Sequence, residues 1–408
     1  MENDYKKVDF EDPADIVVIN TCSVTQLADK KCRQIISKAS RLSPNAIIAV
    51  VGCYSQLKPE EISKINGVDL VLGTKEKFKI LEYIHEIEQK ALTKPLVHSC
   101  EIGEAEEFNP SFSLFERTRS FLKVQDGCDY HCSYCTIPLA RGISRNSSIV
   151  KTVAEAKKIS GQGVKEIVLT GVNIGDFGKT TNETFLELIR ELDKVESIER
   201  YRISSIEPNL LSNEIIDFVA SSRSFVPHFH IPLQSGCNEI LGLMRRRYTR
   251  ELFEERVKTI KRIIPKACIG ADVIVGFPGE TDEYFLDTYN FLEGLDISYL
   301  HVFSYSERRN THAVLLPGKV HPTEKERRSN QLIELSETKR TLFYMQNLGV
   351  QTDVLFESQK VNGNMFGFTP NYIKVETKYN QSLINKTIDV ELASLLPSGN
   401  VAIKFSEI

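Results

Sequence analysis

A recurring alternation of short apolar runs and amphipathic stretches, from about Arg117 to Arg340, is the strongest constraint on the fold of this 408-residue chain. The expected strands are Ser120–Val124, Glu166–Thr170, Arg200–Ile203, His228–His230, Ile269–Val275 and Tyr299–Phe303. The expected helices are Ile149–Ser160, Glu183–Asp193, Asn213–Ser221, Arg250–Ile264 and Thr281–Leu292. Strand–helix repeats of this kind predict a parallel α/β barrel, complete or partial, whose chemistry lies on loops beyond the carboxyl ends of the strands.

Two segments of different character flank this one. The first is predicted to be a small α/β domain with a parallel sheet, built from strands Ile16–Asn20, Ala46–Val51 and Val68–Leu72 and helices Lys30–Arg41 and Pro59–Ile65. The last is predicted to be a small, helix-free β-barrel with strands Gln351–Phe356, Tyr372–Glu376, Thr387–Ala393 and Val401–Phe405. The predicted domains are therefore 1–88, 114–344 and 345–408, with a linker over 89–113.

The composition limits the class of protein and its compartment. The longest apolar runs are strand-sized, far short of the ~20 residues of a membrane helix, and the polar N-terminus has no signal-peptide core. We therefore expect a cytoplasmic protein without a membrane partner. In that compartment we expect the nine cysteines to stay reduced, so their spacing matters more than their number. The net charge of −4 neither indicates nor excludes a nucleic-acid partner.

The most specific motif is GCDYHCSYC, directly after the first strand of the predicted central barrel. It places Cys128, Cys132 and Cys135 in a C-x3-C-x2-C spacing. Three thiolates on one tight loop can ligate three irons of a [4Fe–4S] cluster and leave the fourth iron open to a small molecule. The alternatives are a zinc site or buried thiols, but zinc usually takes four protein ligands in two pairs, and the chain has no second C-x-x-C pair.

This loop resembles that of radical S-adenosylmethionine (radical-SAM) enzymes. The resemblance implies that S-adenosylmethionine binds the open iron, and that an electron from the cluster cleaves it to a 5′-deoxyadenosyl radical. Tyr134, just before the third cysteine, then matches the aromatic residue that packs near the adenine. A plain core aromatic is the alternative for this position.

Three later phrases, each after an expected strand, resemble the family's contacts to S-adenosylmethionine. They are LTGVNIGDFG, RISSIEP and GADVIVGFPGE. The resemblance implies cofactor-binding roles for Gly171, Gly175, Ser204, Ser205, Glu207, Ile274, Gly276 and Glu280. Each phrase by itself is weak, because glycine at a strand end is more often only a turn residue.

Two cysteines of the first segment each follow an apolar strand. Cys22 and Cys53 are expected side by side at one end of the parallel sheet, where small buried thiols are the alternative. Their phrases, NTCSVT and VGCY, resemble the N-terminal domain of radical-SAM methylthiotransferases. The resemblance implies an auxiliary [4Fe–4S] cluster, held by three cysteines and involved in sulfur insertion.

The chain departs from the family at this cluster. Family members carry an earlier cysteine on a preceding strand, and no cysteine precedes Cys22 here. We therefore expect the start of the domain to be missing and the auxiliary cluster to be incomplete. Cys32 is a poor substitute because it lies inside an expected helix, and Cys100, Cys237 and Cys268 are expected to be ordinary thiols.

The C-terminal segment resembles a TRAM domain, an RNA-binding barrel. Aromatic residues of such a barrel can stack on bases, and the candidates are Phe366, Phe368 and Tyr372. Basic residues can contact phosphates or substrate, and the candidates are Arg141, Arg245, Arg246 and Arg247. The alternatives are core aromatics and a solvated basic face.

Taken over almost the whole chain, the resemblance is to radical-SAM methylthiotransferases. The phrases ADKKCRQ and CDYHCSYCTIPLARG most resemble the subgroup that acts on N6-threonylcarbamoyladenosine beside the anticodon. This resemblance implies that a methylthio group is added to C2 of that base in tRNA. It also implies an electron donor, such as flavodoxin or ferredoxin, and a sulfur source. The alternatives are a methylthiotransferase for isopentenyladenosine in tRNA or for a ribosomal protein, and a form that binds tRNA and S-adenosylmethionine without inserting sulfur.

Overall fold

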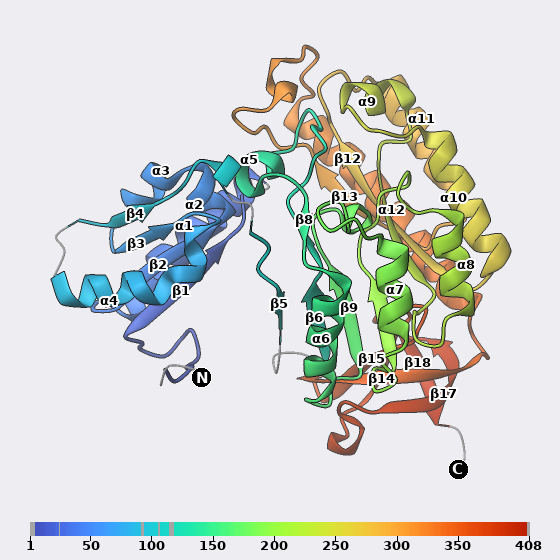
Figure 1. Ribbon diagram of the computed structural model, residues 1–408. Coiled ribbons are helices and arrows are strands. Elements are labelled where there is room, and N and C mark those ends of the chain that lie inside the picture. The colour runs from blue at the N-terminus through green and yellow to red at the C-terminus, as the bar shows by residue number, and fades with distance from the viewer. Residues whose placement is uncertain (1–4, 24, 91–93, 105–106, 114–117, 406–408) are drawn as a thin grey trace. The chain divides into compact units, whose positions relative to one another are not determined.

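The computed structural model describes residues 5–23, 25–90, 94–104, 107–113 and 118–405 (Figure 1). The chain divides into two compact units. Unit 1 contains residues 1–107, 127–143 and 306–314, and unit 2 contains residues 108–126, 144–305 and 315–408. The loop with the three clustered cysteines therefore belongs to unit 1 by its contacts. The predicted domain limits at 88, 113 and 344 stay predictions, and the one at 114 lies outside the described residues.

Unit 1 is built on a four-stranded parallel sheet. Its strands, in sheet order, are β1 (Ile16–Thr21), β2 (Ile47–Gly52), β3 (Leu70–Leu72) and β4 (Leu96–His98). The first three were expected from their apolar runs. The fourth was not expected and lies in the segment predicted as a linker, where only Leu96 and Val97 are apolar.

Helices cover both faces of this sheet. One face packs against α1 (Gln26–Leu42), α2 (Cys53–Leu57) and α3 (Pro59–Ser63), and the other against α4 (Ile80–Lys90), which was not expected. Thr25 caps the N-terminus of helix α1, because its side chain accepts a hydrogen bond from the Ala28 N–H. It buries Cys32, Ile36 and Ala39, at the spacing of one helix face. Short 3-10 turns, η1 (Glu76–Lys79) and η2 (Ile102–Glu104), complete this region.

Unit 2 contains the predicted partial barrel of six parallel strands. They are β6 (Arg119–Lys123), β9 (Glu166–Thr170), β10 (Arg200–Ile203), β11 (His228–Gln234), β12 (Cys268–Val275) and β13 (Tyr299–Ser304). Pairing runs β6-β9-β10 and β11-β12-β13, and parallel bridges Tyr201–Phe225 and Ser205–His230 join the two sheets. β5 (Ser111–Phe112) adds an antiparallel edge to β6. Among the described residues β13 does not pair with β6, so the barrel is open.

The helices of unit 2 cover the outer face of these strands. The predicted ones are present to within two residues as α6 (Ile149–Ser160), α7 (Phe185–Asp193), α8 (Asn213–Ser221), α10 (Arg250–Ile263) and α11 (Asp282–Gly294). Their apolar side chains form one core with outward strand residues such as Ile167, Ile231 and Val273. The remaining short elements of the chain before α12 are α5 (Ile137–Arg141), β7 (Gln125–Asp126), β8 (Arg145–Asn146), η3 (Ile174–Asp176), α9 (Asn238–Leu243) and η4 (His312–Leu315).

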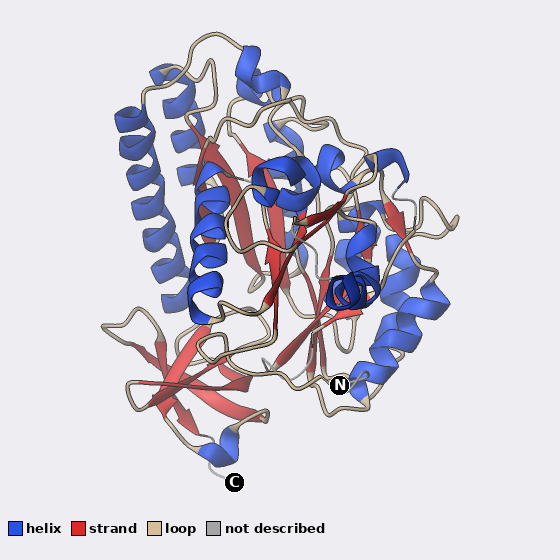
Figure 2. Ribbon diagram, turned by 90° about the vertical axis from the view of Figure 1, so that its left-hand side faces the viewer, coloured by secondary structure: helices blue, strands red, loops and turns tan. Residues whose placement is uncertain are grey.

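A 24-residue helix that the sequence did not reveal, α12 (Pro322–Met345), leads to the C-terminal barrel. This closed barrel has the order β14-β15-β16-β18-β17, and its strands stand out in Figure 2 near the C-terminus. They are β14 (Gln351–Val361), β15 (Asn364–Phe368), β16 (Lys374–Lys378), β17 (Thr387–Leu395) and β18 (Val401–Phe405), with one 3-10 turn, η5 (Gln381–Leu383). Strand β15 was not expected. It pairs with β14 in a hairpin. The turn between the two strands is formed by Asn362 and Gly363, whose positive φ angles of 50° and 80° suit a tight hairpin.

The C-terminal barrel packs against the inner side of β10 and β11. Arg200 donates to the carbonyl of Phe368 at 2.8 Å, and Arg202 donates to the carbonyl of Pro370 at 3.1 Å. The Tyr372 ring stacks on His228 with centroids 4.4 Å apart. These contacts join the two parts of unit 2 through buried polar groups.

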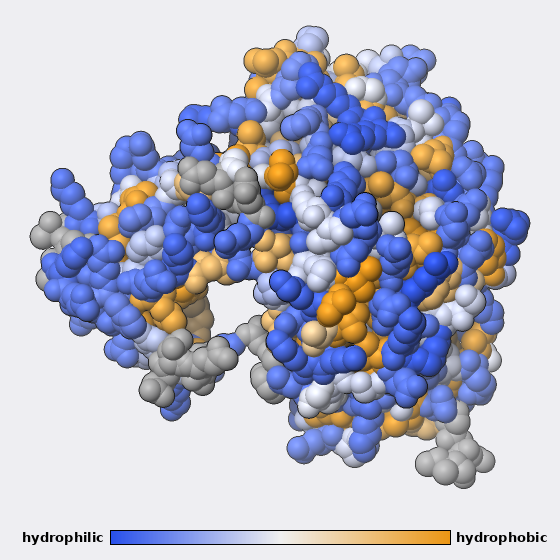
Figure 3. All heavy atoms as spheres, viewed as in Figure 1, coloured by the Kyte–Doolittle hydropathy of each residue, from blue (hydrophilic) through white to orange (hydrophobic). Residues whose placement is uncertain are grey.

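The surface is mainly hydrophilic, with apolar side chains in small separate groups on the face drawn in Figure 3. No helix within the described ranges combines the length and the apolar character needed to span a bilayer.

Candidate active site

The cysteine loop of unit 1 closes tightly on itself. The N–H of Cys128 donates to the carbonyl of Gly142 at 3.0 Å, and the N–H of Cys135 donates to that of Cys132 at 3.1 Å. Gly127 has a φ of 73°, and a Cβ there would lie only 1.8 Å from the carbonyl oxygen of Ile143. Glycine is therefore the residue that this closure permits.

Backbone donors point at two of the three loop sulfurs. The N–H groups of Tyr130 and Ile137 donate to the sulfurs of Cys128 and Cys135, each at 3.4 Å. Such donors stabilise negative charge on sulfur. Cys132 is buried, whereas Cys128 and Cys135 are half-buried. The predicted adenine neighbour, Tyr134, is also half-buried in this loop.

The other two predicted cysteine ligands lie at the carboxyl ends of β1 and β2. Thr21 and Gly52 are register partners, so Cys22 and Cys53 follow paired positions. Cys22 is exposed and Cys53 is buried at the start of α2. The guanidinium Nε of Arg141 donates to the Cys53 sulfur at 3.3 Å, which places this arginine beside a thiol.

The four remaining cysteines have different surroundings. Cys32 is buried in α1 and its thiol donates to the carbonyl of Cys22 at 3.6 Å, while burial raises its pKa. Burial also raises the pKa of Cys237 to about 11 and that of Cys268 to about 12. Cys100 is half-buried, and its carbonyl accepts from Gln56 at 2.9 Å.

A pocket of about 660 Å³ lies within unit 1. Its lining includes Thr136 of the cysteine loop and Arg308, which donates to Asp29 at 3.0 Å and to the carbonyl of Ser23 at 2.6 Å. Burial alone would raise the pKa of Asp29, but hydrogen bonds from Arg308 and Ser23 hold it below its usual value. The sequence did not reveal this cluster, because its partners are 279 positions apart.

In unit 2, the loop after β9 holds Gly171 and Gly175 in crowded positions. A Cβ on Gly171 would lie 2.8 Å from Ile174, and one on Gly175 would lie 2.6 Å from Leu210. The buried Gln125 accepts from the N–H groups of Val172 and Asn173 at 3.0 and 2.8 Å. Packing within the loop favours glycine at 171, and packing against the segment after β10 favours it at 175. The predicted approach of both glycines to a ligand stays a prediction.

After β10, the residues predicted to bind the cofactor are divided between backbone and side-chain roles. Ser204 donates its N–H to the carbonyl of Leu169 at 3.2 Å, and Ser205 bridges to His230. Glu207 forms an ion pair with Arg246, and burial raises the pKa of Glu207 in spite of this partner. The Arg246 side chain is only 4% exposed. It therefore differs from the exposed arginines on either side of it, although the three form one basic run in the sequence.

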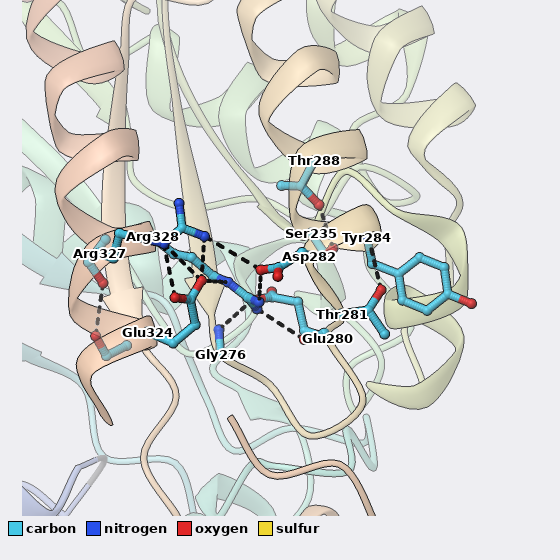
Figure 4. Close-up of polar contacts among 12 residues, drawn as sticks. Ser235, Gly276, Glu280, Thr281, Asp282, Tyr284, Thr288, Glu324, Arg327 and Arg328 are labelled. Carbon is cyan, nitrogen blue, oxygen red and sulfur yellow. Dashed lines mark hydrogen bonds and ion pairs between the residues drawn. The ribbon is translucent and has the colours of Figure 1, made fainter. Parts of the chain in front are cut away.

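The turn after β12 is held by helix α12 (Figure 4). Oε1 of Glu280 accepts from the N–H of Gly276 at 2.8 Å and from Arg328 at 2.6 Å. Arg328 also donates to Asp282 and to Glu324, each at 2.8 Å. Burial raises the pKa of Glu280. Glu280 and Gly276, with half-buried Ile274 before them, were expected from the sequence, whereas Arg328 was not.

Close contact with α12 also fixes the shape of this turn. Gly276 has a φ of 72°, and a Cβ on it would lie 2.3 Å from Cγ of Lys325. Such a position excludes any larger residue. Helix α12 thus supplies both Arg328, which balances the charge of Glu280, and Lys325, whose side chain packs against Gly276.

Two of the three aromatics predicted to stack on RNA bases are engaged within unit 2. The Tyr372 ring stacks on Phe368, with centroids 5.0 Å apart, besides its contact with His228. The guanidinium of Arg119 lies 4.6 Å from the Phe368 centroid and that of Arg202 lies 4.9 Å from the Tyr372 centroid. Phe366 differs: its ring has the Lys374 ammonium 4.3 Å away.

Comparison with known proteins gives consistent matches. The sequence model of the Radical SAM superfamily matches residues 122–292, and that of Uncharacterized protein family UPF0004 matches residues 1–73. Threonylcarbamoyladenosine tRNA methylthiotransferase MtaB of Bacillus subtilis is 40% identical, with 96% of this chain and 88% of that protein covered. The tRNA-2-methylthio-N(6)-dimethylallyladenosine synthase of Acetivibrio thermocellus is 33% identical, with 96% and 83% covered.

Among solved structures, the radical S-adenosylmethionine methyltransferase TsrM of Kitasatospora setae has a TM-score of 0.56 and 15% identity. The match covers 71% of this chain and 62% of TsrM, so this chain spans less than two thirds of that protein. At this identity the likeness supports the fold alone, and it agrees with the predicted α/β class.

The Glu280–Arg328 pair yields a stability prediction. Arg328→Met leaves a buried carboxylate without its main cation, so the free energy of unfolding should fall by about 3–5 kcal/mol. The double variant Glu280→Gln/Arg328→Met should recover part of this loss. The matched control is Arg327→Met, because Arg327 is 49% exposed and pairs with the same Glu324, so its loss should stay below about 1 kcal/mol. Anaerobic urea unfolding measures all three, and equal losses for both arginines would contradict the prediction.

Proposed function

Because the chain belongs to the radical-SAM methylthiotransferase family, we propose that it adds a methylthio group to N6-threonylcarbamoyladenosine in tRNA, at C2 of the base. The carrying observation is the 40% identity over 96% of the chain with a protein named for that substrate. The relative named for dimethylallyladenosine is 33% identical, which favours the threonylcarbamoyl substrate. Position 2 is supported by the "2-methylthio" in that same relative's name.

The cofactors of this family are S-adenosylmethionine and a [4Fe–4S] cluster, with a second, auxiliary cluster in its methylthiotransferases. The loop of Cys128, Cys132 and Cys135 fits such a cluster by its three thiols, by the two N–H groups directed at sulfur and by the glycine closure at Gly127. When bound, the cluster supplies the electron that cleaves S-adenosylmethionine reductively. We assign Cys22 and Cys53 to the auxiliary cluster. Arg141, beside Cys53, then places positive charge next to a ligand sulfur and need not contact phosphate.

The strand-end loops of unit 2 would bind S-adenosylmethionine. The turn at Gly276 is rigid because Glu280 and α12 hold it, so it can present backbone atoms to the adenosine part. The carboxylate of Glu207, with its raised pKa and its arginine partner, is a polar group suited to a ribose or amino group. Backbone at Gly171 and Gly175, and the hydroxyls of Ser204 and Ser205, complete this proposed contact set.

Gly127 provides a direct test of the cysteine loop. Gly127→Ala should abolish cluster binding, because the added methyl group collides with the carbonyl of Ile143. The matched control is Gly163→Ala, since Gly163 has a similar φ of 79° but a methyl group there would meet nothing within 4 Å. Iron and sulfide per chain after anaerobic reconstitution measure the outcome. Equal iron content in the two variants would contradict the loop assignment.

An RNA contact is proposed at the exposed Arg245 and Arg247 and at the half-buried Phe366. Arg245 has a φ of 58°, which reverses the chain after α9 so that Arg246 enters the interior while its neighbours remain exposed. Exposed guanidinium groups can contact phosphates, and the Phe366 ring offers a stacking face for a base. The positions of Phe368 and Tyr372 argue for an internal packing role instead.

The three consecutive arginines should behave differently in tRNA binding. Arg245→Ala and Arg247→Ala should each weaken binding and lower the slope of log affinity against log salt by about 0.7–0.9. Arg246→Ala should leave that slope unchanged and instead destabilise the fold, because Glu207 loses its partner. Filter binding over a salt series measures the slopes. An equal slope change for all three residues would argue against this division.

The proposed reaction is tested with purified tRNA carrying N6-threonylcarbamoyladenosine. The reconstituted chain, with S-adenosylmethionine, sulfide as the sulfur source and reduced flavodoxin or ferredoxin as the electron donor, should form the 2-methylthio nucleoside. The Cys132→Ala variant should form none and should not cleave S-adenosylmethionine. Mass spectrometry of digested tRNA provides the readout. Product only on dimethylallyladenosine tRNA would favour the alternative substrate.

A further inference from the structure

Three polar residues that the proposed reaction does not yet use lie together on the inner face of the partial barrel. His230 of β11, Asp272 of β12 and His301 of β13 come from three adjacent strands. Nε2 of His230 lies 2.8 Å from Oδ1 of Asp272, and Nδ1 of His301 lies 3.4 Å from the same oxygen. Asp272 and His301 are register partners, so their side chains project from the same face of the sheet.

His301 is the member of this triad that is most exposed to solvent. The exposed fractions of the side chains are 11% for His230, 21% for Asp272 and 55% for His301. Phe303, two residues beyond His301 and on the same face, is 49% exposed. Leu300 and Val302, on either side of His301, face the other way, since both pack with the main core. The inner face therefore presents an imidazole and an aromatic ring side by side.

The triad is held in place from behind. The second ring nitrogen of His230, Nδ1, lies 3.2 Å from the hydroxyl of Tyr299, which is also 3.0 Å from Nε2 of His228. His230 therefore contacts partners through both nitrogens. His301 has Nδ1 toward Asp272, so its Nε2 is turned away from that carboxylate. In the protonated ring this nitrogen is a charged donor.

We propose that His301, positioned by Asp272 and His230, binds the carboxylate of the threonyl group on the substrate adenosine. This inference rests on the proposed function. N6-threonylcarbamoyladenosine carries a carboxylate, whereas a dimethylallyl group carries no charge, so a cationic group at this place would discriminate between the two. A protonated His301 would pair with Asp272 through one ring nitrogen and with the carboxylate of the substrate through the other. The exposed ring of Phe303 gives the flat base an apolar surface beside it.

The charge of Asp272 supports this arrangement. Burial alone would raise its pKa, but hydrogen bonds from His230 and His301 hold the pKa well below its usual range. Asp272 is therefore a carboxylate under all working conditions and acts as the fixed acceptor for both rings. The same geometry would allow a divalent cation, because the three ligand atoms lie within 4.8 Å of one another. Binding of such an ion is a distinguishable outcome of the test.

The test compares two anticodon stem-loops that differ only in the modified base, one with N6-threonylcarbamoyladenosine and one with N6-dimethylallyladenosine. His301→Leu should raise KM for the first loop about tenfold or more, the loss expected for one hydrogen bond between charged groups. It should also reduce the preference for the first loop over the second. His301→Lys keeps a cation and should retain most of the preference. His85→Leu, at an exposed histidine of α4, is the control and should change neither value.

Four outcomes separate the possibilities, with iron content and thermal unfolding confirming that each variant is folded. An unchanged KM in His301→Leu, while the wild type modifies the first loop, would overturn this inference alone. One zinc or other divalent ion per wild-type chain, beyond the cluster iron and absent from His301→Leu and His230→Leu, would make the triad a metal site and also overturn it. A wild type that modifies neither loop would overturn the proposed function itself. The KM increase with rescue by lysine supports the assignment.

Discussion

Glu166 on β9 is completely buried, and its charge is balanced by the arginines of the neighbouring strand. Arg202 donates to it at 2.9 Å, and Arg200 lies 3.7 Å away. Burial alone would raise the pKa of Glu166, but Arg202 and its neighbours lower it, so the group stays ionised. A buried charge left without its partner costs several kcal/mol, so this cluster must form whenever the strands pair. Other guanidinium N–H groups of these two arginines donate to carbonyl groups of the C-terminal barrel. Unit 2 therefore depends on this polar cluster to join its two parts.

The sequence predicted most of the fold because most elements carry a local pattern. The parallel strands are β-branched runs between amphipathic helices, and α6 and α8 have the predicted limits. Helix α12 was not predicted from the sequence because its buried positions include Arg328, Ser336 and Lys339 among the apolar ones. A helix whose buried face mixes charged and apolar residues shows no apolar stripe. Strands β4 and β15 were missed for another reason: β4 has only two apolar residues, and Asn364 and Gly367 break the apolar pattern of β15.

The sequence predicts candidate site residues where a motif is contiguous. The C-x3-C-x2-C loop and the GFPGE turn are both compact, and the structure gives each a glycine, Gly127 and Gly276, at a position where a side chain would collide. What no local pattern could show is the support from distant segments. Arg328 reaches Glu280 across 48 positions, and Arg308 reaches Asp29 across 279. The sequence also could not show that the three arginines differ in burial, since one positive φ at Arg245 sends adjacent side chains to different environments.

Side chains alternate along the strands of unit 2, so that one set packs against the helices and the other faces the barrel interior. On β12, Ala271, Val273 and Val275 are buried against the helices, while Asp272 projects inward. On β11, Phe229, Ile231 and Leu233 join the same core. The two histidines of β11 occupy the alternate positions and face the barrel interior with Tyr299. A strand buried on both faces by apolar packing would read as a continuous apolar run. Polar side chains interrupt such runs here, at His228 and His230 of β11, at Asp272 of β12 and at His301 of β13.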